Sequence, residues 1–145
     1  MIDFIPGLNS TTSALTAERI RLDVISQNIA NANTTRTPSG QPYQRQQVTF
    51  ETVLSQQDQA GSASGSQPRM VKIARVQADT RPPRVIYNPG HPDANAQGMV
   101  AMPDINIHEE MADLIASSRT YDANLAVVHA GRNMALQTMA IGKRG

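Results

Sequence analysis

The chain of 145 residues is predicted to be an α+β protein, in which long N- and C-terminal helices pack as a coiled-coil-like pair or bundle. Two observations predict the helices: apolar residues recur about every 3.5 residues along residues 104–141 and, more weakly, along residues 13–32. A third predicts a small β-rich insert, because apolar and polar positions alternate within residues 43–102. The chain is therefore divided into a first helical segment (1–33), the insert (34–103) and a second helical segment (104–145).

The first helix is expected to run from about Ser13 to Ala32, after a lead of residues 1–9 and a group of Ser and Thr residues suited to capping. Its seam repeats every seven residues through Leu8, Leu15, Leu22 and Ile29, and Ile25 and Ala32 join it three residues after the last two. The residues of this seam that we expect to pack against another helix are Leu15, Leu22, Ile25 and Ile29.

Three asparagines, Asn28, Asn31 and Asn33, crowd the end of this first helix. Polar groups in a helix seam usually lower stability, but they can fix the register or the choice of partner. We therefore regard the three asparagines as candidates for setting register. The alternative, that they only mark the solvated edge of the seam, stays open at the level of sequence.

The insert is expected to start with a turn over residues 38–42 and a half-buried strand over residues 43–54. A polar loop rich in Ser, Gln and Gly follows over residues 55–68, before a return strand over residues 69–78. The alternation shifts at Ala74 within the return strand, which indicates a β-bulge. Short strands over residues 85–87 and 100–102 complete the expected insert.

The second helix is expected over residues 104–141, which contain no proline. At 1.5 Å per residue it would be about 57 Å long, whereas a compact chain of this size has a radius of gyration of only about 15 Å. The helix should therefore protrude and need a partner along its length. Its seam residues expected to pack against the first helix, in the same chain or in a neighbouring one, are Ile107, Met111, Leu114, Tyr121, Leu125 and Val128.

The composition excludes several classes of protein. Aromatic residues make up 3% of the chain and Trp is absent, which is little material for a large globular core. The net charge of +1 gives no basic surface for nucleic acid, and the lack of Cys excludes a disulfide framework. No apolar run approaches the roughly 20 residues of a membrane-spanning helix, so no direct membrane span is expected.

The sequence offers no catalytic, cofactor-binding or metal-binding motif. The segment His108–Met111 begins like a zinc-binding helix, but the second histidine of that motif is absent. The segment Gly61–Gly65 has the glycines of a nucleophile elbow, yet its central residue is Ala63. We therefore expect no cofactor and no metal, and we do not expect an enzyme.

Several segments resemble the bacterial flagellar axial proteins, the family of rod and hook subunits. Residues 17–33, AERIRLDVISQNIANAN, resemble the N-terminal motif of that family. The continuation TTRTPSGQPYQRQQVTFE (34–51), the segment from YNPGHPDANAQ to NLAVV (87–128) and the ending MALQTMAIGKRG are similar to a member from the proximal rod. The resemblance covers almost the whole chain except residues 55–68.

This resemblance implies a structural protein that polymerises through its terminal helices into a hollow helical shaft, which is both drive shaft and export channel. It implies a place in the rod of the basal body, across the periplasm, reached through the flagellar type III export apparatus without a cleaved signal peptide. The implied partners are copies of the chain itself, the rod proteins FlgB, FlgF and FlgG, and the adaptor FliE. Two alternatives stay open: another axial rod protein, and a cytoplasmic coiled-coil adaptor.

Overall fold

The computed structural model describes the backbone of residues 6–54 and 69–142 and the side chains of residues 10–51 and 75–142. Its elements in chain order are α1 (Pro6–Ala30), β1 (Gln46–Leu54), β2 (Arg69–Ala78), β3 (Arg84–Tyr87), β4 (Met99–Met102) and α2 (Ile107–Gly142). The α+β class with two terminal helices around a β-rich insert is confirmed. The polar loop expected over residues 55–68 lies outside the described residues.

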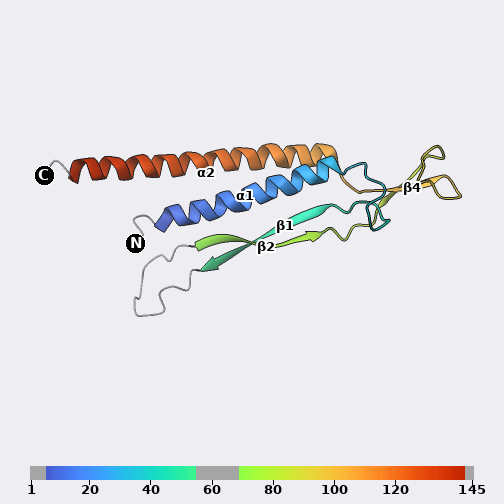
Figure 1. Ribbon diagram of the computed structural model, residues 1–145, viewed down its shortest axis with the longest axis horizontal. Coiled ribbons are helices and arrows are strands. Elements are labelled where there is room, and N and C mark those ends of the chain that lie inside the picture. The colour runs from blue at the N-terminus through green and yellow to red at the C-terminus, as the bar shows by residue number, and fades with distance from the viewer. Residues whose placement is uncertain (1–5, 55–68, 143–145) are drawn as a thin grey trace.

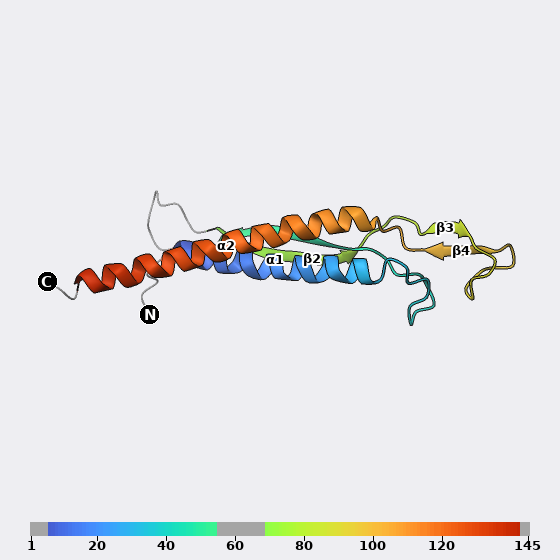
Figure 2. The same ribbon diagram turned by 90° about the horizontal axis from the view of Figure 1, so that it is seen from above.

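The molecule is elongated and built in layers around α1. Figure 1 shows α1 between α2 on one side and the β1–β2 hairpin on the other, and α1 contacts all three of these elements. The two helices run antiparallel, and the β3–β4 hairpin projects beyond the end at which α1 finishes and α2 begins (Figures 1 and 2). The terminal helices therefore pack together, as the sequence predicted.

The first helix begins at Pro6, not near Ser13, so the expected lead of residues 1–9 is too long. Proline suits the first turn of a helix, because its fixed backbone angle is helical and the missing N–H needs no partner there. The helix ends at Ala30 and closes in a turn, in which the Asn31 N–H donates to the Gln27 carbonyl. The Thr34 N–H then donates to the Asn31 carbonyl.

The β1–β2 hairpin is antiparallel and contains the predicted bulge. Thr49 is opposite Arg75, whereas Phe50 is opposite Ile73, so Ala74 is the extra residue. Strand β1 starts at Gln46, later than the expected Tyr43, because the Tyr43 backbone N–H bonds outside the sheet. The Tyr43 N–H donates to the Thr34 carbonyl, and the Arg45 carbonyl accepts from the Asp79 N–H.

The β3–β4 hairpin encloses a tight loop over residues 88–98 that depends on Gly98. This residue has φ of 75°, and an added Cβ would lie 2.9 Å from Tyr87 Cε2. The Asn88 N–H donates to the Gly98 carbonyl at 2.8 Å and closes the loop. A left-handed backbone and a close aromatic ring together require glycine at this position.

Replacing Gly98 with alanine is therefore expected to destabilise the chain more than replacing Gly40, whose φ is also left-handed at 80° but whose Cβ would meet nothing within 4 Å. Both variants carry the backbone cost of about 1–2 kcal/mol, and only Gly98→Ala adds the clash with Tyr87. The free energy of unfolding, from urea titration followed by circular dichroism, measures the difference. Equal losses of stability in the two variants would refute the role of the ring.

The described core is thin and centred on α1. Its buried apolar side chains are few: Ala17, Val24, Ile25, Ala32 and, at the β3–β4 hairpin, Val100. Many larger apolar side chains, most of them on α2, remain exposed. In a single chain, many apolar side chains of α2 therefore remain exposed to solvent.

Candidate assembly interface

The side of α2 that packs against α1 combines small and polar residues with larger apolar ones. Apart from Asp113, its buried and half-buried residues follow steps of four and three, the spacing of a coiled-coil seam. They are Glu110, Leu114, Ser117, Tyr121, Asn124, Val128, Gly131 and Ala135. Gly131 and Ser117 leave room for the neighbouring backbone, so the helices can approach closely here. Of the α2 residues predicted for the interface, this side contains Leu114, Tyr121 and Val128.

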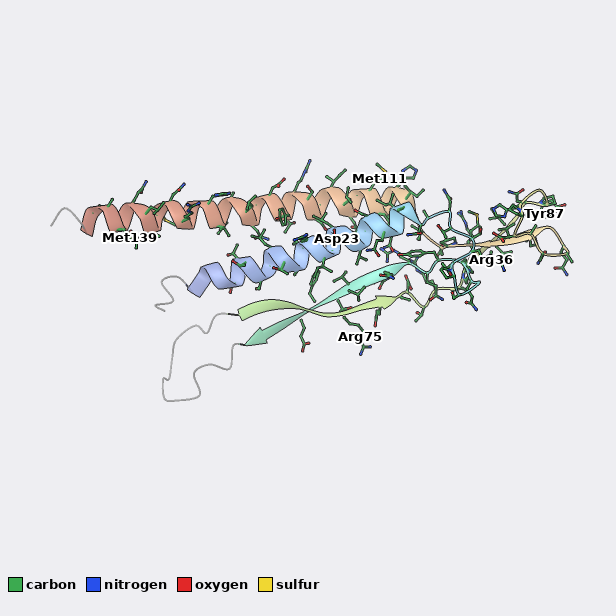
Figure 3. All side chains as sticks on the ribbon, viewed as in Figure 1. Asp23, Arg36, Arg75, Tyr87, Met111 and Met139 are labelled. Carbon is green, nitrogen blue, oxygen red and sulfur yellow. The ribbon has the colours of Figure 1, made fainter. Side chains whose placement is uncertain are left out.

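The other three α2 residues predicted for the interface are exposed: Ile107, Met111 and Leu125. On α1, Ile25 is buried, while Leu15, Leu22 and Ile29 are half-buried. The predicted seam of α2 therefore divides between the side toward α1 and a free side. Figure 3 shows Met111 and Met139, two of the exposed apolar residues, near opposite ends of α2.

Two free faces of α2 also follow coiled-coil spacing. We call the positions 116, 120, 123, 127, 130, 134, 137 and 141 the uncharged face, because none of them is Asp, Glu, Lys or Arg. We call the positions 111, 115, 118, 122, 125, 129, 132, 136 and 139 the mixed face, because it combines apolar residues with Asp122 and Arg132. Every residue of both faces is exposed in the single chain.

The end of α2 extends past the start of α1 (Figures 1 and 2). With 36 residues against 25, α2 is the longer described helix by 11 residues, or about 16 Å. Residues 133–142 of this end contain no charged side chain. Except for Ala135, every residue of this uncharged end is exposed, which is unusual for a helix in water, because such helices normally carry a charged or polar face.

Asn28 links three elements at the opposite end of the helix pair. Its side-chain oxygen accepts from the Gln46 N–H at 2.9 Å and from the Tyr43 hydroxyl at 3.1 Å. Its amide nitrogen donates to the Gln46 carbonyl at 2.9 Å and to Glu110 Oε2 at 3.1 Å. The side chain thus pairs with the backbone of the first residue of β1 as a neighbouring strand would, and it joins that strand to both helices.

Glu110 connects this contact to the insert. We call the linked side chains the junction; they are Asn28, Tyr43, Arg45, Asp79, Arg81 and Glu110. The Glu110 side chain is 1% exposed, and Arg45 Nε donates to its Oε1 at 2.6 Å. Arg45 also lies 3.9 Å from Asp79, which accepts from Gln47 and Arg81, and Arg81 reaches Asp104 at 3.2 Å. A buried carboxylate needs such charged hydrogen-bond partners, because desolvation alone would be costly. The junction therefore fixes the β1–β2 hairpin against the helices.

Comparisons with known proteins support the resemblance noted in the sequence. A family model described as "Flagella basal body rod protein" matches residues 8–36, and one described as "Flagellar basal body rod FlgEFG protein C-terminal" matches residues 96–141. The flagellar basal-body rod protein FlgC of Bacillus subtilis is 38% identical over 148 residues, covering 94% of this chain and 97% of the relative. FlgC of Borreliella burgdorferi is 36% identical over 144 residues, covering 93% and 95%.

The chain belongs to the FlgC family of flagellar basal-body rod proteins. FlgC of Escherichia coli O6:H1 agrees, with 38% identity over 131 residues that cover 90% of this chain and 92% of the relative. As a member of the FlgC family the chain is a structural subunit of the flagellar basal-body rod, as the sequence predicted. The two matched regions contain nearly all of α1, with Asn28, and nearly all of α2, with Glu110.

Two of the predicted asparagines of this FlgC-family chain do not join the junction. The Asn31 amide donates to the Gln27 carbonyl within its own helix, and its side-chain oxygen accepts from the Thr34 hydroxyl. Asn33 is exposed. The structure thus brings Asn28 alone among the three into contact with α2.

Sequence reasoning missed most of the junction, namely Tyr43, Arg45, Asp79, Arg81 and Glu110. One signal could have identified Glu110, because it stands in four-and-three step with Leu114, Ser117 and Tyr121. A carboxylate at a seam position requires a partner. The partner itself, Arg45, lies 65 residues away in a polar stretch and carried no such signal.

The junction shifts the pKa values of two of its groups. Burial, followed by the negative charge of Glu110, raises the pKa of the Tyr43 hydroxyl above its ordinary value. The hydrogen bond from the Arg81 side chain is the main cause that lowers the pKa of the Asp79 carboxyl. Asp79 is therefore held in its charged form, which attracts Arg45 and Arg81.

The charged Asp79 carboxylate is expected to stabilise the fold at neutral pH and to lose this effect at acidic pH. Its pKa is lower in the folded than in the unfolded chain, so the folded state binds fewer protons, and stability falls as pH drops below about 4. The difference in unfolding free energy between the native sequence and Asp79→Asn should be constant above about pH 5 and shrink below it. A difference that stays constant down to about pH 2 would contradict this assignment.

The junction borders an open groove. The groove has a volume of about 310 Å³ and runs between α1, β1 and the start of α2, and the Arg21 guanidinium lies 5.9 Å from the centre of the Phe50 ring in its wall. Within residues 6–54 and 69–142, no group of three His, Asp or Glu residues is placed to hold a metal. The described helices also include none with the length and hydropathy to cross a membrane.

Proposed function

We propose that this chain forms part of the wall of the proximal rod, a hollow helical shaft, and that α2 is the element through which it assembles. The observation that carries the proposal is the set of exposed apolar side chains at coiled-coil spacing on α2 in a member of a rod-protein family. A helix that is apolar on several sides is stable in water only when other helices cover it. Neighbouring subunits supply that cover in a tube of nearly parallel helices.

The α1–α2 pair then forms the inner tube, and the β1–β2 and β3–β4 hairpins lie at its outside. The neighbours are other copies of the chain and the rod proteins FlgB, FlgF and FlgG, with the adaptor FliE and the flagellar export apparatus at the base. The rod position places the chain in the periplasm after type III export without cleavage of a signal peptide. The role is structural, without catalysis, cofactor or nucleic acid.

Met134→Asp tests this assembly. Met134 is 61% exposed, so the charge should leave the single chain folded, as circular dichroism can verify. Within the wall the same charge would be buried without a partner, and we expect the amount of the variant in isolated basal bodies to fall about tenfold or more. Swimming motility should fall with it when the variant is the only copy in the cell.

Asn133→Asp is the matched control, because it adds the same charge at the adjacent exposed residue, which belongs to neither free face. It should be incorporated at close to the native level. Normal incorporation of Met134→Asp would contradict assembly through α2. If the native chain were found in the cytoplasm and were absent from basal bodies, the adaptor function would replace the rod function.

A further inference from the structure

We infer that the rod wall contains a heterologous contact in which the uncharged face of α2 in one copy packs, parallel, against the mixed face of α2 in the next copy. The inference rests on the proposed function and adds to it the two surfaces and the direction of the contact. A contact between two different surfaces repeats without closing, so it builds an open helical array instead of a dimer.

The spacing of the uncharged face indicates that a helix covers it. Its apolar members are Ala116, Ala123, Val127, Ala130, Met134 and Ile141, at alternating steps of four and three with Thr120 and Gln137. Only a neighbouring helix presents side chains at a matching period, because a strand repeats every two residues. The absence of Asp, Glu, Lys and Arg from this face excludes a strongly charged partner surface.

The mixed face of a second copy fits this description. Its apolar members, Met111, Ile115, Leu125, Leu136 and Met139, follow the same alternation, and all are exposed. They extend along nearly the whole helix, and the uncharged face accompanies them from residue 116 to residue 141. The contact is therefore continuous along α2, and it leaves the side of α2 that packs against α1 undisturbed.

Helical symmetry fixes the direction of the pair, because every copy in a helical shaft keeps the same orientation along the shaft axis. The first half of the uncharged face has small residues, including Ala116 and Ala123, and the first half of the mixed face has the large residues Met111 and Ile115. Parallel helices place these large side chains opposite the alanines, which is the alternation that fills a helix interface. Two uncharged faces packed parallel and in register would place alanine against alanine and leave a gap.

The three sides of α2 are then all covered. One side packs against α1 in the same chain, and the two free faces pack against different neighbours. The single charge between Ala123 and Gly142, Arg132, lies on the mixed face, where its long side chain can extend to the edge of the contact. This arrangement accounts for a helix that bears apolar residues all around its circumference.

Disulfide trapping tests the inference directly, because the chain contains no Cys and every thiol is an introduced one. Ala123→Cys labels the uncharged face, and Ile115→Cys or Leu125→Cys labels the mixed face. Within one helix these pairs point to different sides, so they cannot bond in the same chain. Mild oxidation of isolated rods that carry either double variant should give a ladder of dimers, trimers and longer products, while each single variant stays monomeric.

Two results would overturn the inference. Dimers as the main product from Ala123→Cys alone would show that the uncharged face pairs with itself. Assembled basal bodies in which neither double variant forms more oligomer than the single variants would show that the two faces do not meet. The second result leaves the rod function intact, because assembly itself is measured by the amount of protein in the basal bodies.

A size change gives an independent measurement. Ala123→Leu should separate the helices at the uncharged face and lower incorporation into basal bodies about tenfold, a difference of about 1.4 kcal/mol. Ala126→Leu is the matched control, since Ala126 is an exposed alanine of the same helix that belongs to neither face. Equal incorporation of the two variants would refute the contact.

Discussion

Glu110→Ala is expected to lower the free energy of unfolding by about 3–5 kcal/mol, the cost of breaking a buried charge pair by removing one partner. The variant leaves the Arg45 guanidinium, whose side chain is only 21% exposed, without its 2.6 Å partner. It also removes an acceptor of the Asn28 amide. The remaining contact of Arg45 with Asp79, at 3.9 Å, is too long to replace the lost bond. Urea unfolding followed by circular dichroism measures the change.

Asp122→Ala is the control for this prediction, because it removes a carboxylate from an exposed position of the same helix. It should change stability by no more than about 0.5 kcal/mol. Glu110→Gln separates charge from hydrogen bonding, since glutamine keeps an acceptor for Arg45 but not the charge, and it should lie between the two. A Glu110→Ala variant as stable as Asp122→Ala would show that the junction does not hold the fold.

Asn28→Ala is expected to destabilise the chain by about 2–4 kcal/mol and to release β1 from the helices. The variant deprives the Gln46 N–H and carbonyl, the Tyr43 hydroxyl and Glu110 of a partner, and each buried group left unpaired costs about 1–3 kcal/mol. The loss should appear locally, as faster amide exchange at the start of β1. If Asn28 fixes the position of the insert, the same variant should also be present in isolated basal bodies in a smaller amount than the native chain.

Asn31→Ala is the matched control, because that asparagine lies three residues further along and bonds only to Gln27 and Thr34. It should cost less than about 1 kcal/mol and leave β1 protected. Asn28→Asp adds a sharper comparison, since it would place a second carboxylate next to Glu110 without the amide donor. If Asn28→Ala assembled as well as Asn31→Ala, Asn28 would have no role in register.

How well the sequence predicted the structure differs from element to element. The bulge at Ala74 was predictable, because a shift in the alternation of apolar and polar residues along a strand indicates an inserted residue. The start of α1 was misplaced, because the Ser and Thr residues that look like caps lie inside a helix that begins at Pro6. The Ser13 and Thr16 hydroxyls donate to the Ser10 and Thr12 carbonyls inside this helix, so a capping residue type does not by itself mark a boundary.

The sequence by itself determined the α+β class, the two long helices, the order of the strands and the family of rod proteins, because periodicity and local motifs are written in consecutive residues. The tertiary structure alone decided which side of α2 meets α1. The period of 3.5 residues is shared by three sides of that helix, and the side toward α1, which contains Glu110, Ser117 and Asn124, is not the most apolar of them. It also decided the junction, because the contact of Asn28 and Arg45 with Glu110 joins residues 82 and 65 positions apart, and only folding brings them together.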